Sequence, residues 1–138
     1  MQETRYGLRV ELPVDYEEAV ERTTVALKAE GFGVLTTIDV KATLKQKLDV
    51  DFRRYVILGA CNPPLAHKAL STELEIGLLL PCNVVVYEDG PGRSVVAAMA
   101  PLPTMGVVGN ETLAPIGEQA DRKLRNALTS LEQGQGQA

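Results

Sequence analysis

Two apolar runs interrupted by prolines constrain the fold of this chain more than any other feature. Tyr55–Cys61 and Asn83–Tyr87 are apolar at nearly every position. A strand with one face in water alternates apolar and polar residues, so these runs predict strands that are covered on both faces. Asn62 and Pro63 end the first strand, and Pro64 suits the first position of a helix, where no backbone N–H is needed.

The segment between the two runs determines how they are paired. Apolar residues at helical spacing predict a helix from about Pro64 to Leu74. Glu75–Pro81 looks extended and is long enough to bring the chain back to the end of the sheet from which it left. We therefore expect antiparallel strands, with Cys61 and Cys82 at the same end of the sheet.

The two cysteines and the single histidine are the side chains best suited to nucleophilic or metal-binding chemistry. Cys61 precedes a predicted helix N-terminus, whose free N–H groups favour an anionic thiolate. His67 lies one turn into that helix, on the flank of its apolar stripe, and Cys82 would complete a Cys/His/Cys cluster. The three interpretations are a reactive thiol pair, a metal site and buried structural cysteines. The spacing matches no metal signature, which favours structural cysteines.

The same segment carries a family resemblance. GACNPPLAHKAL followed by LLLPCNVVVYE resembles the bacterial and archaeal family catalogued as domain of unknown function 302, and nearly the whole chain fits the layout of that family. The specific matches are Cys61, Asn62, Pro63, Pro81 and Cys82. The resemblance implies a small α+β protein with a curved antiparallel sheet backed by helices, assembled as a homodimer. It gives these five positions no chemical role.

The rest of the chain predicts further elements. Asp15 and Glu18 form a capping box at the start of a helix, and the turn residues around Gly90 predict a hairpin, which excludes an all-parallel sheet. Pro101–Asn110 is expected to be a loop. The other expected elements are strands at Thr4–Leu12, Phe32–Val40 and Ser94–Ala100, and helices at Asp15–Glu30, Lys41–Leu48 and Glu111–Glu132.

Length and charge limit the possible classes of protein. A chain of 138 residues fits one domain, expected at 1–132 with a flexible tail at 133–138, and needs no disulfide or metal for stability. The net charge of −4 offers no basic field for nucleic acid. The apolar runs are shorter than the roughly 20 residues of a membrane helix. The N-terminus leads directly into a strand, so we expect no secretory signal and a cytoplasmic location.

These elements predict a single α+β domain with a mainly antiparallel curved sheet and helices packed on one face. The strands that look apolar on both sides need cover on the second face as well. Either a second copy of the chain in a homodimer or a small apolar ligand would supply it, and the sequence does not separate the two.

Three functional hypotheses follow. The first is a homodimer that binds a small ligand near Cys61, Asn62, Pro63, His67, Pro81 and Cys82. The second is a thiol redox or thiol-transfer protein, with Cys61 as nucleophile and Cys82 as resolving thiol. The third is a structural or partner-binding module. With one histidine and no nucleophile motif, the sequence assigns no catalytic residue, metal ligand or cofactor.

Overall fold

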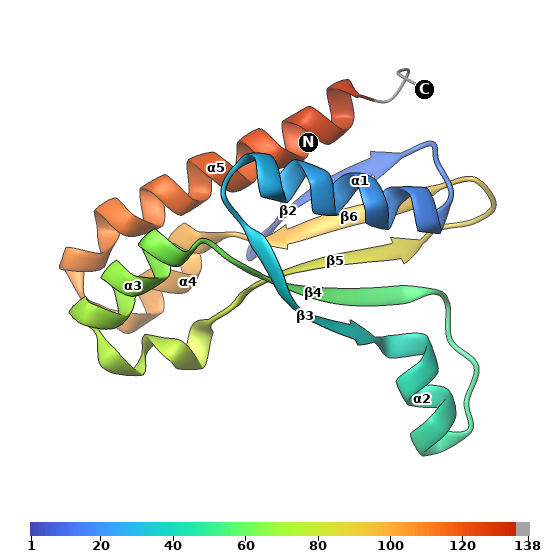
Figure 1. Cartoon of the computed structure of the whole chain (residues 1–138), viewed down its shortest axis with the longest axis horizontal. Coiled ribbons are helices and arrows are strands. Elements are labelled where there is room, and N and C mark those ends of the chain that lie inside the picture. Colours follow the sequence, from blue (N-terminus) through green and yellow to red (C-terminus); the bar gives the residue numbers. More distant parts are fainter. Residues whose placement is uncertain (135–138) are drawn as a thin grey trace.

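The protein is built on one six-stranded antiparallel sheet with the strand order β1-β2-β6-β5-β4-β3 (Figure 1). The computed structural model describes residues 1–134. The strands are β1 (Gln2–Glu3), β2 (Gly7–Leu12), β3 (Gly33–Asp39), β4 (Tyr55–Cys61), β5 (Cys82–Glu88) and β6 (Ser94–Met99). The antiparallel α+β fold predicted from the sequence is confirmed.

Two long helices cover one face of this sheet. Helix α1 (Tyr16–Ala29) starts where predicted, because the Asp15 carboxylate accepts a 2.9 Å hydrogen bond from the Glu18 N–H. Helix α5 (Ala114–Gln133) lies alongside it (Figure 1). Their apolar stripes meet the sheet in the main core, which includes Leu8, Leu27, Phe32, Val56, Val84, Val96 and Leu124.

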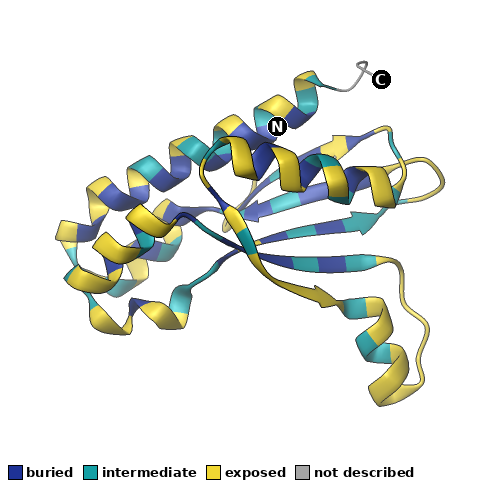
Figure 2. Ribbon diagram, in the orientation of Figure 1, coloured by how far each residue is buried: buried dark blue, intermediate teal, exposed yellow. Residues whose placement is uncertain are grey.

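Burial alternates along the central strands because successive side chains of a strand point to opposite faces (Figure 2). Val56, Leu58, Val84 and Val86 point toward the helices and are at most 4% exposed. The residues that alternate with them and point to the second face are half-buried at Tyr55, Ile57, Val85 and Tyr87. The described chain places no helix over that second face, which is nonetheless largely apolar.

A second apolar cluster lies at one end of the sheet. It joins α3 (Pro63–Thr72), the 3-10 helix η1 (Leu74–Leu79), α4 (Pro101–Val108), the 3-10 helix η2 (Glu111–Leu113) and the first half of α5. Its members are Leu65, Ala69, Ile76, Met105, Leu113, Ile116 and Ala120. The medium helix α3 therefore packs at this end of the sheet instead of covering a face.

Two predictions about this end of the molecule are wrong. The expected extended run Glu75–Pro81 is mostly the helix η1, which buries Ile76. The expected loop Pro101–Asn110 contains α4, which runs from Pro101 to Val108 and is capped by Gly109, a residue with a φ of 74°. In both segments the packing of apolar side chains against neighbouring helices outweighs the glycines and prolines that suggested irregular structure.

The strand β3, at one edge of the sheet, and the helix α2 (Val40–Leu48) that follows it form an arm (Figure 1). Of the seven residues of β3, only Val34 is half-buried, and α2 has no buried residue (Figure 2). The arm is anchored by the pairing of β3 with β4, which is interrupted by a register shift between Val34 and Thr36.

The chain ends differ in detail from the predictions. The expected strand Thr4–Leu12 starts at Gly7, because Thr4 and Gly7 close a turn in which the Thr4 N–H donates to the Gly7 carbonyl at 2.8 Å. The last helix includes Gln133, and residues 135–138 of the expected tail lie outside the described residues. Between residues 1 and 134, no helix has the length and apolarity needed to cross a membrane.

Candidate functional site

The antiparallel pairing of β4 and β5 brings the two halves of the sequence motif together. Ala60 at the end of β4 pairs with Cys82 at the start of β5, so Cys61 and Cys82 lie at the same end of the sheet. This arrangement confirms the prediction from the sequence. The route is different, since the chain returns through η1 and not through an extended segment.

The motif surrounds a cavity of about 330 Å³ between the end of the sheet and helices α3, α4 and α5. We call it the motif cavity. Four of the six expected site residues line it: Cys61, Asn62, Pro81 and Cys82. Its remaining walls are mainly aliphatic, with Leu65, Ala69, Leu80, Met105, Ile116 and Ala120 among them. These side chains make the motif cavity almost entirely apolar.

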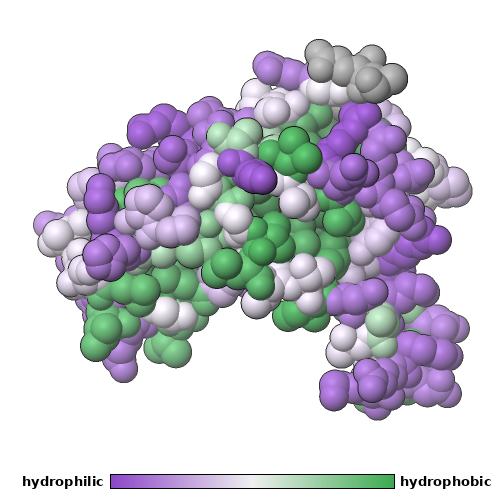
Figure 3. All heavy atoms as spheres, viewed as in Figure 1, coloured by the Kyte–Doolittle hydropathy of each residue, from purple (hydrophilic) through white to green (hydrophobic). Residues whose placement is uncertain are grey.

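Exposed leucines lie in the lining of the motif cavity and on the neighbouring helix η1. Leu35 and Leu70 belong to its lining, and Leu35 is 68% exposed. Leu74 and Leu78 on η1 are more than 80% exposed. Figure 3 shows an apolar surface over the corner formed by α3 and η1. Exposed apolar surface of this kind often marks a binding site.

Asn62 has a structural task at this site. Its side-chain oxygen accepts a hydrogen bond from the Leu65 N–H at 3.3 Å and so caps α3. Its amide group donates to the Glu30 carbonyl at 3.4 Å, which links the end of α1 to the start of α3. Both polar ends of the side chain are thus used within the fold, and Asn62 positions the cavity wall.

The two thiols differ in environment. Cys82 is 7% exposed, and burial, followed by the nearby Cys61, raises the pKa of its thiol to about 11. The Cys82 thiol is therefore protonated near neutral pH. Cys61 is half-buried, and both cysteines are free. Cys82 pairs across the strands with Ala60 and not with Cys61.

The other two expected site residues lie outside the motif cavity. Pro63 and His67 are both exposed on α3, and neither belongs to the lining. Pro63 has a local role as the first residue of that helix. Among residues 1–134, no group of three or more His, Cys, Asp or Glu side chains is arranged to hold a metal ion.

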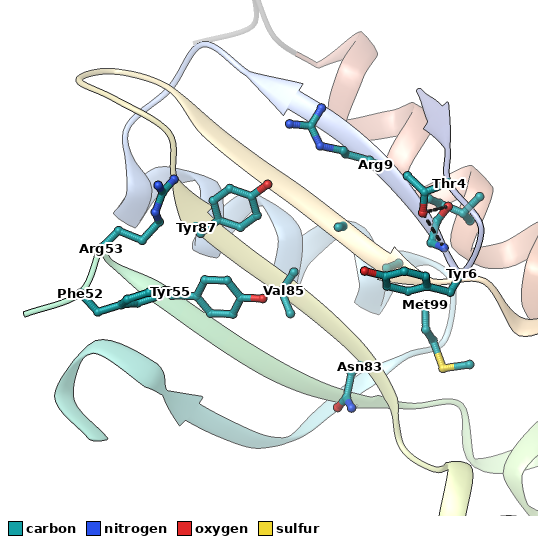
Figure 4. A pocket seen from close by; sticks show the side chains of 14 residues that line it. Thr4, Tyr6, Arg9, Phe52, Arg53, Tyr55, Asn83, Val85, Tyr87 and Met99 are labelled. Atoms are coloured by element: carbon teal, nitrogen blue, oxygen red, sulfur yellow. Dashed lines mark hydrogen bonds between the residues drawn. The ribbon is translucent and has the colours of Figure 1, made fainter. Parts of the chain in front are cut away.

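A second and larger hollow, of about 780 Å³, lies on the face of the sheet opposite α1 and α5 (Figure 4). We call it the open-face hollow. Aromatic and arginine side chains surround it, among them Tyr6, Arg9, Arg53, Tyr55 and Tyr87. The apolar runs of the sequence predict that this face needs cover, but they do not point to these residues. The sequence held one signal for them: each of the two mainly aliphatic runs contains a single tyrosine, Tyr55 in one and Tyr87 in the other.

Comparison with known proteins agrees with this fold. The crystal structure of an uncharacterized conserved DUF302 protein from Bacillus stearothermophilus is 31% identical in sequence, with a TM-score of 0.83. The match covers 91% of this chain and 98% of that one. Among curated proteins, none matches. The family described as Domain of unknown function DUF302 matches residues 8–131, and the chain belongs to this family.

Proposed function

We propose that this protein is a homodimeric domain that binds a small apolar molecule in the motif cavity. The observation that carries this proposal is the lining of the cavity. Aliphatic side chains, the buried Cys82 thiol and the half-buried Cys61 thiol surround a volume of about 330 Å³. That volume is at the lower end of the range for small-molecule pockets, roughly 300 to 1,000 Å³. The exposed Leu35 and Leu70 extend the apolar surface outward, which suits a molecule with a hydrocarbon chain.

The cavity offers no charged group to such a ligand. Asn62 already uses its amide within the fold, and Cys82 is held neutral by burial. Binding would therefore be driven by removal of apolar surface from water, at about 25 cal/mol per Å². A strongly polar or charged ligand would lose its hydration there without gaining partners.

The test uses decanol as the probe and the alkylation rate of Cys61 as the readout. Cys61 is the accessible thiol of the cavity, so decanol in the cavity should slow its reaction with iodoacetamide. Ala66→Phe, which fills the cavity from α3, should abolish the protection. Ser71→Phe, at an exposed position of the same helix, should leave it intact. Equal protection in both variants, or none in the native protein, would refute the proposal.

The thiol-redox alternative makes a different prediction. A resolving thiol must become a thiolate, and the raised pKa of Cys82 keeps it protonated at neutral pH. We expect oxidised glutathione to modify Cys61 without forming a Cys61–Cys82 disulfide. Efficient formation of that disulfide, seen by mass spectrometry and lost in Cys82→Ser, would favour the redox function instead. A purely structural module would show neither decanol protection nor disulfide formation.

The homodimer is proposed to form through β3. This strand is an edge whose outer row of backbone groups pairs with no strand among residues 1–134, and it exposes Leu35 and Ile38, the latter at 47%. Exposed edge strands pair readily with a second strand, and two-fold symmetry would join two sheets along β3. A cytoplasmic location completes the proposal, since both cysteines are free and thiols stay reduced there.

Sedimentation of the native protein and two variants tests this interface. Ile38→Lys places a charge on β3 and should convert dimers to monomers at micromolar concentration. Val25→Lys changes a residue on α1 that is 64% exposed and should leave the dimer intact. A native protein that sediments as a monomer, or an Ile38→Lys protein that remains dimeric, would rule out pairing through β3.

A further inference from the structure

The open-face hollow is chemically unlike the motif cavity. Three of the four tyrosines of the chain, Tyr6, Tyr55 and Tyr87, line it, together with Phe52. Arg9 and Arg53 belong to the lining, whereas no aspartate or glutamate does. The two hollows share no lining residue. A site lined by aromatic rings and arginines, with no acidic side chain in its lining, selects for flat anions.

One wall of the hollow is a row of rings. Tyr55 and Tyr87 are cross-strand partners, and their rings stack with centroids 5.4 Å apart and planes 6° from parallel. The Phe52 ring lies 6.2 Å from Tyr55, and the Arg53 guanidinium lies 5.8 Å from the centre of the Tyr87 ring. The wall thus presents both aromatic surface and a cation.

The floor of the hollow is apolar and leads to a second cation. Val85 pairs with Ala97, and Ala97 pairs with Arg9 on the next strand. Across the floor from Tyr55 stands Tyr6, which is 79% exposed, and the hydroxyl groups of both point into the hollow (Figure 4). Burial, then Tyr87 and Tyr6, raise the pKa of Tyr55, so its phenol remains a hydrogen-bond donor.

The arginines are held only weakly by their neighbours. Arg9 lies 3.7 Å from Glu11 and donates a long hydrogen bond of 3.4 Å to the Gln2 side-chain oxygen. Arg53 lies 3.8 Å from Asp89 and donates to the Glu88 carbonyl at 3.3 Å. Exposed pairs of this kind contribute about 0–1 kcal/mol, so an incoming anion can compete for either guanidinium. The chain as a whole carries a net charge of −4, which would repel an anion. Any preference for anions must therefore come from these two arginines.

We infer that the open-face hollow binds a flat aromatic molecule that carries a carboxylate, sulfonate or phosphate group. The ring system lies on Val85 and Ala97, between Tyr6 and the Tyr55–Tyr87 wall. The anionic group accepts hydrogen bonds from Arg9 or Arg53, and the Tyr55 phenol donates to the same ligand. This site is independent of the apolar ligand proposed for the motif cavity.

Two probes with nearly the same rings but different charge test the inference. Anilinonaphthalene sulfonate carries a sulfonate, and phenylnaphthylamine has no charge. The double variant Arg9→Gln/Arg53→Gln should weaken binding of the sulfonate about tenfold or more, because charge-assisted hydrogen bonds are lost. Binding of the neutral probe should change less than about twofold. Arg122→Gln on α5, an exposed position on the other side of the sheet, should affect neither probe.

The location of the bound sulfonate is checked by NMR of labelled tyrosine rings. The resonances of Tyr6, Tyr55 and Tyr87 should shift on titration, while Tyr16, which packs against the main core, serves as the internal control.

Ala97→Glu puts a negative charge on the floor and should weaken sulfonate binding at least tenfold relative to Ala97→Gln. Equal effects of the arginine changes on both probes, or no shifts at the three tyrosines, would overturn the proposal. Neither result would bear on decanol protection of Cys61.

Discussion

Gly59 on β4 and Thr36 on β3 approach so closely that position 59 has no room for a side chain. A Cβ at residue 59 would lie 2.0 Å from the Thr36 Oγ1 and 2.9 Å from the Pro81 Cγ. This contact occurs just after the register shift in β3, where Thr36 pairs with Gly59. It fixes the position of β3 against the proline of the family motif, beside the motif cavity.

Replacement of Gly59 should therefore destabilise the protein. Gly59→Ala is expected to cost about 1–3 kcal/mol of unfolding free energy, because the ring of Pro81 cannot rotate away. Thr36→Ala in the same chain should recover part of the loss. Gly33→Ala is the matched control, since a Cβ at that strand position meets nothing within 4 Å. Urea unfolding measures all three, and equal stability of Gly59→Ala and Gly33→Ala would contradict the steric argument.

Asn62 should matter for stability through both of its hydrogen bonds. Asn62→Ala removes the cap of α3 and the link to Glu30, and we expect a loss of about 1–2 kcal/mol. Asn62→Asp keeps the cap acceptor, so its stability should fall between those of Asn62→Ala and the native protein. Asn126→Ala also removes an amide that donates to Glu30, but at an exposed site, and should cost less than about 0.5 kcal/mol. Thermal or urea unfolding distinguishes these outcomes.

The raised pKa of Cys82 predicts a loss of stability at alkaline pH. Burial favours the neutral thiol in the folded protein, so its pKa rises from 9.0 to about 11. The stabilisation is complete below pH 9 and disappears as the pH rises toward 11, since the unfolded chain then releases a proton that the folded chain retains. The whole effect is about 2–3 kcal/mol.

Comparison with Cys82→Ala isolates this effect from the other groups that titrate in the same range. Between about pH 8 and pH 11, the native protein should lose about 2–3 kcal/mol more unfolding free energy than the variant. The pH profiles of the two proteins would run parallel if the Cys82 thiol were not held neutral. Iodoacetamide should correspondingly modify Cys82 slowly near neutral pH.

Arg125 is predicted to stabilise the join between β1 and α5. Its guanidinium donates to the nearly buried Asp121 at 2.7 Å and also to Glu3. Arg125→Ala would leave the Asp121 carboxylate without this partner, at an expected cost of about 1–3 kcal/mol. Arg122→Ala, at an exposed position of the same helix, should change stability by less than about 0.5 kcal/mol. A loss no larger than that of the control would show that the contact is energetically neutral.

The sequence by itself determined the elements whose signals are local. The apolar run Tyr55–Cys61 is a strand with the predicted bounds, Asp15 caps α1, and the turn at Gly90 makes the hairpin between β5 and β6. Each of these depends on residues close together in the chain, where periodicity, capping and turn chemistry act directly. The family motif is also visible in the sequence.

Only the tertiary structure decided which cavity the family motif surrounds and which face of the sheet the helices cover. The segments at Leu74–Leu79 and Pro101–Val108 become helices because they pack against α3 and α5, which no local pattern shows. Arg9 and Arg53 line the same hollow because β6 and β5 lie between β2 and β4 in the strand order. Strand order and helix packing arise from contacts between distant residues, so the motif cavity and the open-face hollow exist only in the folded chain.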